Sequence, residues 1–311
     1  MKWVVGLALL LALFWAVTLW KAARHERMAE AAFPPSGKFL TVKGHRVHYT
    51  EMGQGRPLVL IHGLSGNIRD MTFSLMPKLA ERYRVIAFDR PGMGYTPPMG
   101  GATITEQAEL LADAAGALGA KQPIVMGHSY GGAVALAWAV HRPEDLSALV
   151  LEASPAYPWE GAMPLLYRVN SGPLAMVAIP LITAWVPDRV VDKAIAETFQ
   201  PQDEVPGYAA HIGAPLSLRR SALRANAQHR AGLLDQISAL HRSYPDIAVP
   251  VEWIHGTADT TVGLSIHAEP FLRDVPQARL TALDGIGHMV HNTRPGAVVE
   301  AIHRAAERSA D

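Results

Sequence analysis

The chain has 311 residues, 49% of them hydrophobic, so it is long enough to bury a large core in one domain. Its 28 basic residues balance its 28 acidic residues, and this removes the electrostatic basis for a nucleic-acid partner. The absence of cysteine excludes disulfides, thiol nucleophiles and zinc sites with cysteine ligands.

The first predicted element is an uncharged apolar stretch, residues 3–20, which as a helix is nearly long enough to cross a hydrocarbon core of about 30 Å. A cleaved signal peptide would have a shorter apolar region and a small-x-small site soon after it, whereas this stretch runs into the basic sequence KAARHER. We therefore predict a single-pass membrane anchor over residues 1–22 and a linker over residues 23–37, in which Pro34-Pro35 stops any helix. The excess of basic residues after the stretch favours a cytoplasmic catalytic domain.

From residue 38 onward, predicted strands alternate with predicted helices. The first two predicted strands, 38–44 and 45–53, form a hairpin that turns near Lys43-Gly44. Further strands are predicted at 57–63, 83–89, 123–128, 146–154, 249–256 and 278–285. Helices are predicted at 72–82 and 103–119, with one more from residue 130 and one from residue 295. This alternation predicts an α/β fold with a mostly parallel central sheet and helices on both faces. In such a sheet, ligands bind beyond the carboxyl ends of the strands.

Residues 155–245 break the alternation. They contain many prolines and an apolar segment, residues 173–187, that is too short and too interrupted by proline for a second membrane span. We interpret them as a helical cap inserted into a core formed by residues 38–154 and 246–311. Candidate lining residues for an acyl pocket in this cap are Leu174, Met176, Ile179, Leu181 and Trp185.

The sequence Gly127-His128-Ser129-Tyr130-Gly131 has the pattern Gly-x-Ser-x-Gly and lies between a predicted strand and a predicted helix. A tight turn at this corner strains the backbone of the serine and projects its hydroxyl away from the sheet, and glycines on either side avoid collisions with neighbouring backbone. The alternative is a glycine-rich turn with a bystander serine. The strand before the motif and the helix after it favour a nucleophile.

With this motif the chain resembles the α/β-hydrolase fold superfamily, and specifically its cap-bearing, esterase- or lipase-like members with a serine nucleophile. The resemblance covers nearly all of residues 38–308. The other motifs that carry it are His62-Gly63, Asp89 to Gly94, His255 to Asp259 and Gly287-His288. It implies a catalytic triad in the chain order nucleophile, acid, histidine, which corresponds to Ser129, Asp259 and His288.

Two members of this triad have competitors. A serine hydroxyl needs a base to take its proton and a third group to orient that base. His291 is the nearest alternative to His288 as the base, but it lacks the preceding Gly-x-Gly. Glu152 is an alternative to Asp259, because some relatives place the acid after the strand that ends in LVLEAS.

The negative charge of a tetrahedral intermediate requires preorganised hydrogen-bond donors. The resemblance implies that these are the backbone N–H groups of Leu64 and Tyr130. It also implies supporting roles for His62 and Gly63 in the loop before Leu64, and for His128 beside the nucleophile.

These residues predict ester cleavage through an acyl-enzyme, with no cofactor and no metal. The apolar cap segment and the predicted membrane anchor favour an apolar acyl or lipid-like small molecule as the substrate. A serine at position 129 argues against relatives with an aspartate nucleophile, such as those resembling haloalkane dehalogenases and epoxide hydrolases. Carbon–carbon bond hydrolases and cofactor-free haloperoxidases of the same fold stay open as alternatives. A non-catalytic, membrane-tethered binding protein is the alternative from another class, and the sequence leaves the oligomeric state open.

Overall fold

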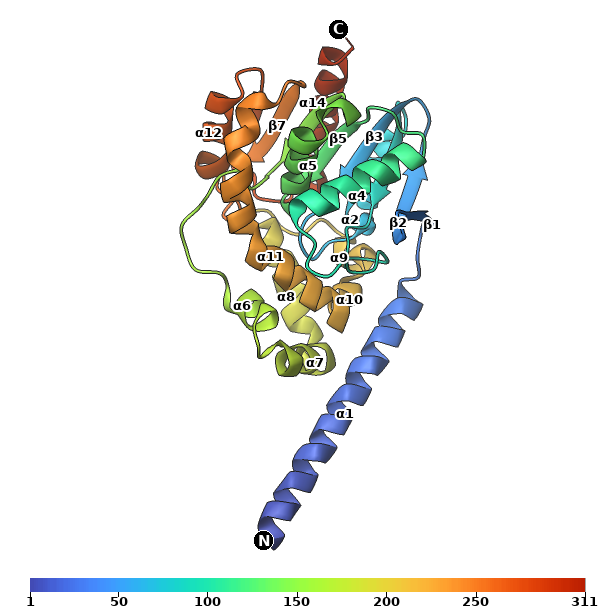
Figure 1. Cartoon of the computed structure of the whole chain (residues 1–311), viewed down its shortest axis with the longest axis vertical. Coiled ribbons are helices and arrows are strands. Elements are labelled where there is room, and N and C mark those ends of the chain that lie inside the picture. Colours follow the sequence, from blue (N-terminus) through green and yellow to red (C-terminus); the bar gives the residue numbers. More distant parts are fainter. Residues whose placement is uncertain (311) are drawn as a thin grey trace.

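The central feature of the fold is an eight-stranded sheet in the order β1-β2-β4-β3-β5-β6-β7-β8 (Figure 1). It is seen in a computed structural model that describes residues 1–310. β2 pairs antiparallel with β1 and β4, and all other neighbours are parallel, as the sequence predicts. The strands are β1 (Lys38–Val42), β2 (His45–Met52), β3 (Arg56–Ile61), β4 (Tyr83–Phe88), β5 (Ile124–His128), β6 (Ala148–Glu152), β7 (Val251–Gly256) and β8 (Arg279–Leu283).

The middle strands are mostly apolar because both faces of the sheet are covered. In β3, Val59 and Ile61 pack into one buried cluster, and Leu58 and Leu60 pack into the cluster on the opposite face. The first face is covered by α4 (Ile104–Ala117), α5 (Tyr130–His141) and α12 (Leu264–Asp274). The second face is covered by α2 (Ile68–Phe73), α3 (Leu75–Leu79) and α14 (Pro295–Arg308), with α13 (Val290–Thr293) leading into α14.

Local turn and cap chemistry explains several element boundaries. The β1–β2 hairpin turns at Lys43 (φ 49°) and Gly44 (φ 82°), a pair of left-handed residues typical of a two-residue hairpin loop. The predicted helix 72–82 is instead two short helices, α2 and α3, that meet at Ser74. The first begins at Ile68 because the side chain of Asn67 accepts a hydrogen bond from the N–H of Arg69 and caps it. The helix α12 was not predicted.

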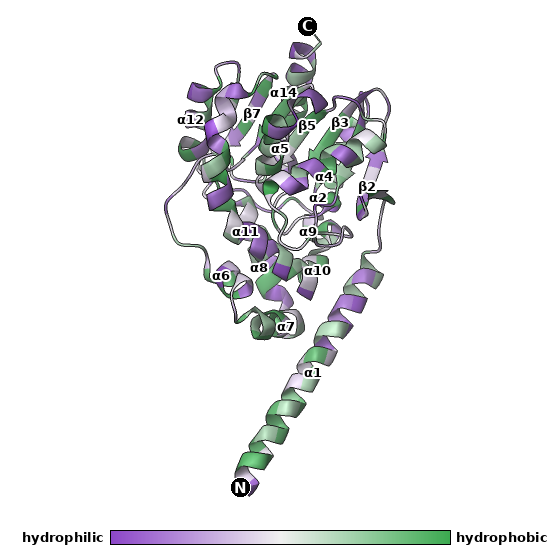
Figure 2. Cartoon of the chain, in the orientation of Figure 1, coloured by the Kyte–Doolittle hydropathy of each residue, from purple (hydrophilic) through white to green (hydrophobic). Residues whose placement is uncertain are grey.

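The N-terminal helix α1 (Lys2–Ala32) is longer than the sequence predicts. Residues 23–32, which were predicted to be linker, continue the helix, because good helix formers fill this stretch and no breaker occurs before Pro34-Pro35. The helix is long and apolar enough to cross a membrane by length and composition. Figure 2 shows that its apolar half is the N-terminal half, which projects from the body of the molecule.

The chain between β6 and β7 forms a helical cap beside α1 (Figure 1). Its helices are α6 (Leu165–Ser171), α7 (Ala175–Trp185), α8 (Asp188–Phe199), α9 (Tyr208–Ile212), α10 (Ala214–Ser217) and α11 (Arg220–Leu240). The long helix α11 packs against α4 and α5 of the core. The cap is therefore placed over the end of the sheet at which Ser129 lies.

Candidate active site

The candidate nucleophile Ser129 occupies a strained corner between β5 and α5. Its backbone has φ 52° and ψ −123°, in the left-handed region that costs a non-glycine residue about 1–3 kcal/mol. A Cβ added to Gly127 would lie 2.2 Å from the carbonyl oxygen of Gly131, and a Cβ on Gly131 would lie 2.2 Å from that of Ile61. Ser129 itself is only half-buried. The flanking glycines thus permit the corner, and the serine at its apex stays accessible.

The candidate acid and base, Asp259 and His288, contact one another directly. Nδ1 of His288 lies 2.7 Å from Oδ2 of Asp259, and Oδ1 of Asp259 accepts hydrogen bonds from the N–H groups of Thr261 and Val262. Burial raises the pKa of Asp259, but hydrogen bonds from His255 and His288 outweigh it and hold that pKa well below its ordinary value. The carboxylate is therefore ionised and can fix the orientation of the imidazole.

The imidazole of His288 lies beside the segment that carries Ser129. The rings of His288 and His128 have centroids 4.8 Å apart, and Nε2 of His128 lies 3.3 Å from the carbonyl oxygen of His288. Burial lowers the pKa of His128 to about 4, so this histidine is neutral at pH 7. The three residues predicted as a triad thus come from well-separated parts of the chain to the same end of the sheet.

The loop after β3 touches the nucleophile. A Cβ added to Gly63 would lie 3.2 Å from Cβ of Ser129, so the following residue, Leu64, is next to the corner. Within residues 1–310, neither the N–H of Leu64 nor that of Tyr130 donates a hydrogen bond. Tyr130 is also the first residue of α5, whose N-terminus favours negative charge. Two free backbone donors therefore flank Ser129.

His62 and Arg90 hold the loop that carries Leu64 in place, and Arg90 was not among the predicted site residues. Arg90 is fully buried and donates hydrogen bonds to the carbonyl oxygens of His62 and Gly63. Nε2 of His62 accepts the backbone N–H of Arg90, and burial with the nearby guanidinium lowers the pKa of His62 to about 4. The motif Asp89 to Gly94, noted for the fold resemblance, was the available signal for Arg90.

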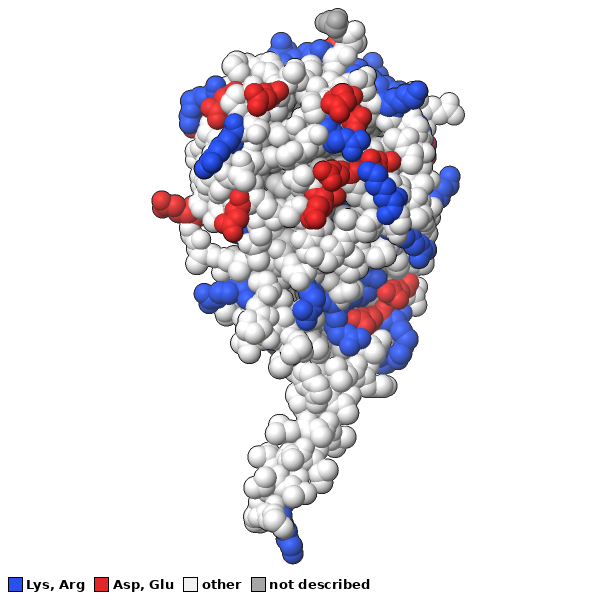
Figure 3. Space-filling view, in the orientation of Figure 1, with Lys and Arg blue, Asp and Glu red and all other residues white. Residues whose placement is uncertain are grey.

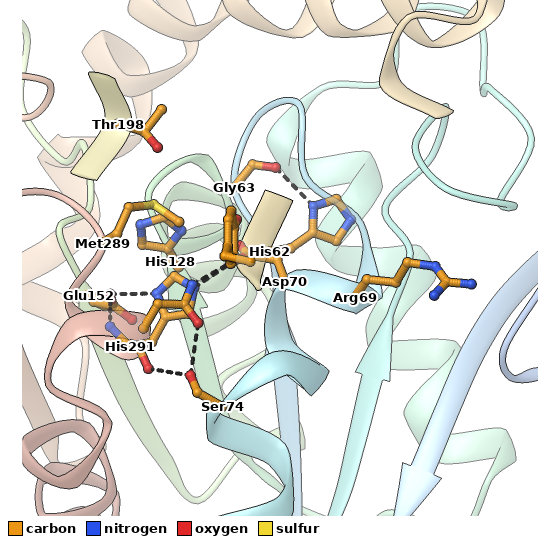
Figure 4. A network of polar contacts seen from close by, with 12 residues as sticks. His62, Gly63, Arg69, Asp70, Ser74, His128, Glu152, Thr198, Met289 and His291 are labelled. Atoms are coloured by element: carbon orange, nitrogen blue, oxygen red, sulfur yellow. Dashed lines mark hydrogen bonds and ion pairs between the residues drawn. The ribbon is translucent and has the colours of Figure 1, made fainter. Parts of the chain in front are cut away.

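The two competitors, Glu152 and His291, bind one another instead of joining the pair described above (Figure 4). Nδ1 of His291 lies 2.8 Å from Oε1 of Glu152, and its Nε2 lies 3.0 Å from Oδ1 of Asp70. Burial lowers the pKa of His291, but the two carboxylates outweigh it and raise that pKa to about 10. His291 is therefore a buried cation with both nitrogens engaged. It is not available to accept a proton from Ser129, and Glu152 does not contact His288.

The same network contains a group that could hold a metal ion. Asp70, His128 and His291 each offer one ligand atom, and these atoms lie within 4.8 Å of one another. A metal would have to displace a proton from an imidazolium that two carboxylates stabilise. Tyr208 and Asn292 also donate hydrogen bonds to Asp70. The hydrogen-bond donors around Asp70 and the two carboxylates around His291 favour a proton on His291 over a metal ion. Asp70 had no sequence signal, because its partners lie far away along the chain.

A histidine from the cap lies against the corner. The ring of His229, in α11, stacks on that of Tyr130 with centroids 5.5 Å apart. Burial and the charge of Arg90 lower the pKa of His229 to about 3, and its Nδ1 has no hydrogen-bond partner in the part of the chain that the structure describes. His229 was not among the predicted site residues, because no motif surrounds it in the sequence.

The predicted acyl-pocket residues do not form a pocket together. Leu174, Met176 and Trp185 are 63%, 73% and 43% exposed, and Trp185 packs on α1. Ile179 is buried between α7 and α11, and Leu181 is half-buried. The expectation for Leu174, Met176 and Trp185 is wrong, because these side chains, at the start of α7 or within it, are exposed on its outer side and do not line an enclosed cavity.

Comparisons with known proteins agree with this architecture. The profile of a family described as alpha/beta hydrolase fold matches residues 56–295. An uncharacterized protein of Mycobacterium bovis is 27% identical over 90% of this chain and 84% of its own length. The hydrolase YugF of Bacillus subtilis is 27% identical over 87% and 97%, respectively. The crystal structure of a bacterial membrane phospholipase A is similar with a TM-score of 0.67 and 23% identity, over 100% of both chains.

Proposed function

The chain belongs to the α/β-hydrolase fold family, which supports hydrolase activity, and from that premise we propose that it is a serine hydrolase that cleaves carboxylic esters. The observation that carries the proposal is the contact of 2.7 Å between His288 and Asp259, next to a serine in a strained strand-to-helix corner. An imidazole held by an ionised carboxylate is the arrangement that activates a serine hydroxyl.

In the proposed mechanism, Ser129 attacks the ester carbonyl while Nε2 of His288 takes the hydroxyl proton. Asp259 holds the imidazole and stabilises its charged form. The backbone N–H groups of Leu64 and Tyr130 donate to the oxyanion of the tetrahedral intermediate. His288 then gives its proton to the departing alcohol, and a water activated by the same imidazole releases the acid from Ser129.

The proposed substrates are esters with apolar acyl chains that partition into membranes. Two considerations support this choice: α1 has the length and composition of a membrane span, and one structural relative is described as a membrane phospholipase A. We propose that residues 1–22 anchor the enzyme in a bilayer. The division of the remainder into a core of residues 38–154 and 246–311 and a cap of residues 155–245 is part of the same proposal.

A series of p-nitrophenyl esters of increasing acyl length tests this function on the full chain in detergent micelles. We expect turnover that depends on acyl length and falls to background in Ser129→Ala, since loss of a serine nucleophile costs about 10⁶-fold in a comparable enzyme. Negligible turnover of every ester, together with rapid cleavage of a vinylogous diketone, would contradict the proposal and favour a carbon–carbon bond hydrolase.

A further inference from the structure

The cap exposes a group of large apolar side chains. Six side chains in or next to α6 and α7 are between 43% and 73% exposed. These six, called the apolar cap face below, are Leu165, Leu166, Leu174, Met176, Val177 and Trp185. A cluster of this kind on a soluble domain marks a surface that contacts a partner.

The packing of α7 explains why these side chains point outward. Ala175, Ile179 and Thr183 are spaced four residues apart and bury the inner face of α7 against α11. The rest of the helix is also apolar, and on its outer side Met176 and Val177 are 73% and 50% exposed. The fold therefore presents Met176 and Val177 to the surroundings rather than to the active site.

The apolar cap face lies directly alongside α1. The ring of Trp185 stacks on Phe14 with centroids 6.1 Å apart and an interplanar angle of 8°, and its Nε1–H donates to Oγ1 of Thr18 at 3.0 Å. Nζ of Lys21 lies 3.6 Å from the centroid of the Trp185 ring. Figures 1 and 2 show α7 beside α1 at a level where both helices are apolar.

Ion pairs fix the angle between α1 and the cap. Glu26 contacts Arg220 at 2.7 Å and Glu30 contacts Arg219 at 2.9 Å. Figure 3 shows charged side chains where α1 meets the body and none along the projecting part of the helix until its tip. In any bilayer that α1 crosses, the depth of the apolar cap face is therefore set by the part of α1 that it lies beside.

That depth follows from the helix geometry. Lys21 is the first charged residue after the apolar stretch, and Phe14 precedes it by seven positions. At about 1.5 Å per residue, Phe14 lies about 10 Å below the level of Lys21. Trp185 spans the levels from Phe14 to Lys21, and amphipathic helices that lie in a membrane surface bury their apolar side by about 5–10 Å.

We propose that the apolar cap face lies in the boundary between headgroups and acyl chains of the bilayer that α1 crosses. Exposed Arg168 in α6 and Arg189 in α8 flank α7 along the chain and meet lipid phosphates there. This inference rests on the proposed membrane anchor and deepens the proposed function, since it brings the cap of an esterase to the surface that holds apolar esters. The occupant of the face is lipid, not a second copy of the chain.

The absence of cysteine makes a depth measurement direct. Val177→Cys places a single thiol on the apolar cap face, and Glu300→Cys places one on the exposed side of α14, at the far end of the molecule from α1 (Figure 1). Each full-length variant is labelled with the fluorophore NBD and reconstituted in phosphatidylcholine vesicles, with and without lipids that carry a nitroxide on the acyl chain. We expect the nitroxide lipids to quench the probe at residue 177 and aqueous iodide to quench the probe at residue 300.

Two results would overturn the inference. Equal iodide quenching at the two positions would mean that the face is in water. Protection from iodide without quenching by nitroxide lipids would mean that protein covers the face. The readout does not depend on turnover, so quenching by lipid without any ester cleavage would refute only the proposed function.

A second comparison connects the face to substrate access. Leu166→Glu with Val177→Glu adds two charges to the apolar cap face without touching the candidate active site. We expect turnover of an ester dissolved in vesicles to fall by about tenfold, with turnover of a short water-soluble ester unchanged. An equal loss with both substrates, or no loss with either, would contradict the proposed role of the face.

Discussion

The substitution Asp259→Asn tests the assignment of the acid with little change in shape. Oδ1 of Asp259 accepts the N–H groups of Thr261 and Val262, and an asparagine oxygen can keep both contacts. The amide nitrogen then takes the place of Oδ2, which lies 2.7 Å from Nδ1 of His288. The buried loop is preserved, and the change is confined to one atom, which faces the imidazole of His288 and lies 3.3 Å from Nε2 of His255.

That atom reverses the hydrogen bond. The amide donates to Nδ1 of His288 and forces the ring proton onto Nε2, which is the nitrogen that has to accept the proton of Ser129. The imidazolium formed during attack also loses the stabilising carboxylate. The same change in a serine protease triad lowers kcat by about 10⁴-fold, which corresponds to about 5–6 kcal/mol in the activation free energy. We expect a loss of this size for Asp259→Asn.

The assay is kcat on a water-soluble p-nitrophenyl ester, with Glu152→Gln as the matched variant and thermal unfolding of both proteins as a check on folding. Glu152 is also a buried carboxylate bound to a histidine, but its partner is His291. Less than about a tenfold loss in Asp259→Asn, with activity abolished in a folded Glu152→Gln, would refute the reasoning and make Glu152 the acid.

Two further predictions concern stability. Gly131→Ala puts a Cβ 2.2 Å from the carbonyl oxygen of Ile61, so we expect denaturant unfolding to report a loss of about 1–3 kcal/mol, and an unchanged unfolding midpoint would contradict the close packing at the corner. Burial is the chief cause that lowers the pKa values of four buried histidines from the ordinary 6.5 to about 3 or 4. The unfolded chain therefore binds more protons than the folded chain as the pH falls below 6.5. Their contribution to the free energy of unfolding is complete above pH 6.5 and is lost as the pH falls towards 4. The thermal midpoint should therefore fall between pH 6.5 and pH 4. A midpoint that stays constant over this range would contradict the burial of neutral imidazoles. These four residues are His62, His128, His229 and His267.

Local signals explain why so much of the fold could be predicted. The strands β3 and β5 are short apolar runs that end at glycine-containing turns, and a strand covered on both faces has that composition wherever it lies in the sheet. The corner at Ser129 is local in part: a Cβ on Gly127 would meet the backbone of Gly131, whereas a Cβ on Gly131 would meet the backbone of Ile61 in β3. The hairpin turn at Lys43-Gly44 depends only on two left-handed residues.

The features that sequence reasoning missed depend on distant contacts. Asp70 and His291 are 221 positions apart, and only the folded chain makes His291 a cation rather than a candidate base. The orientation of α7 was missed for a different reason. A helix that is apolar on all sides has no periodicity to indicate which side is buried, so Met176 was assigned to a pocket although it points outward.

The central claim is that Ser129 is an activated nucleophile, and covalent labelling tests it most directly. A fluorophosphonate reacts only with a serine whose hydroxyl is activated by a neighbouring base. The full chain is treated with the reagent, digested and mapped by mass spectrometry, with Ser129→Ala in parallel. The account predicts one modified residue, Ser129, and no modification of the variant. An unlabelled wild-type protein, or the label on another serine, would contradict it.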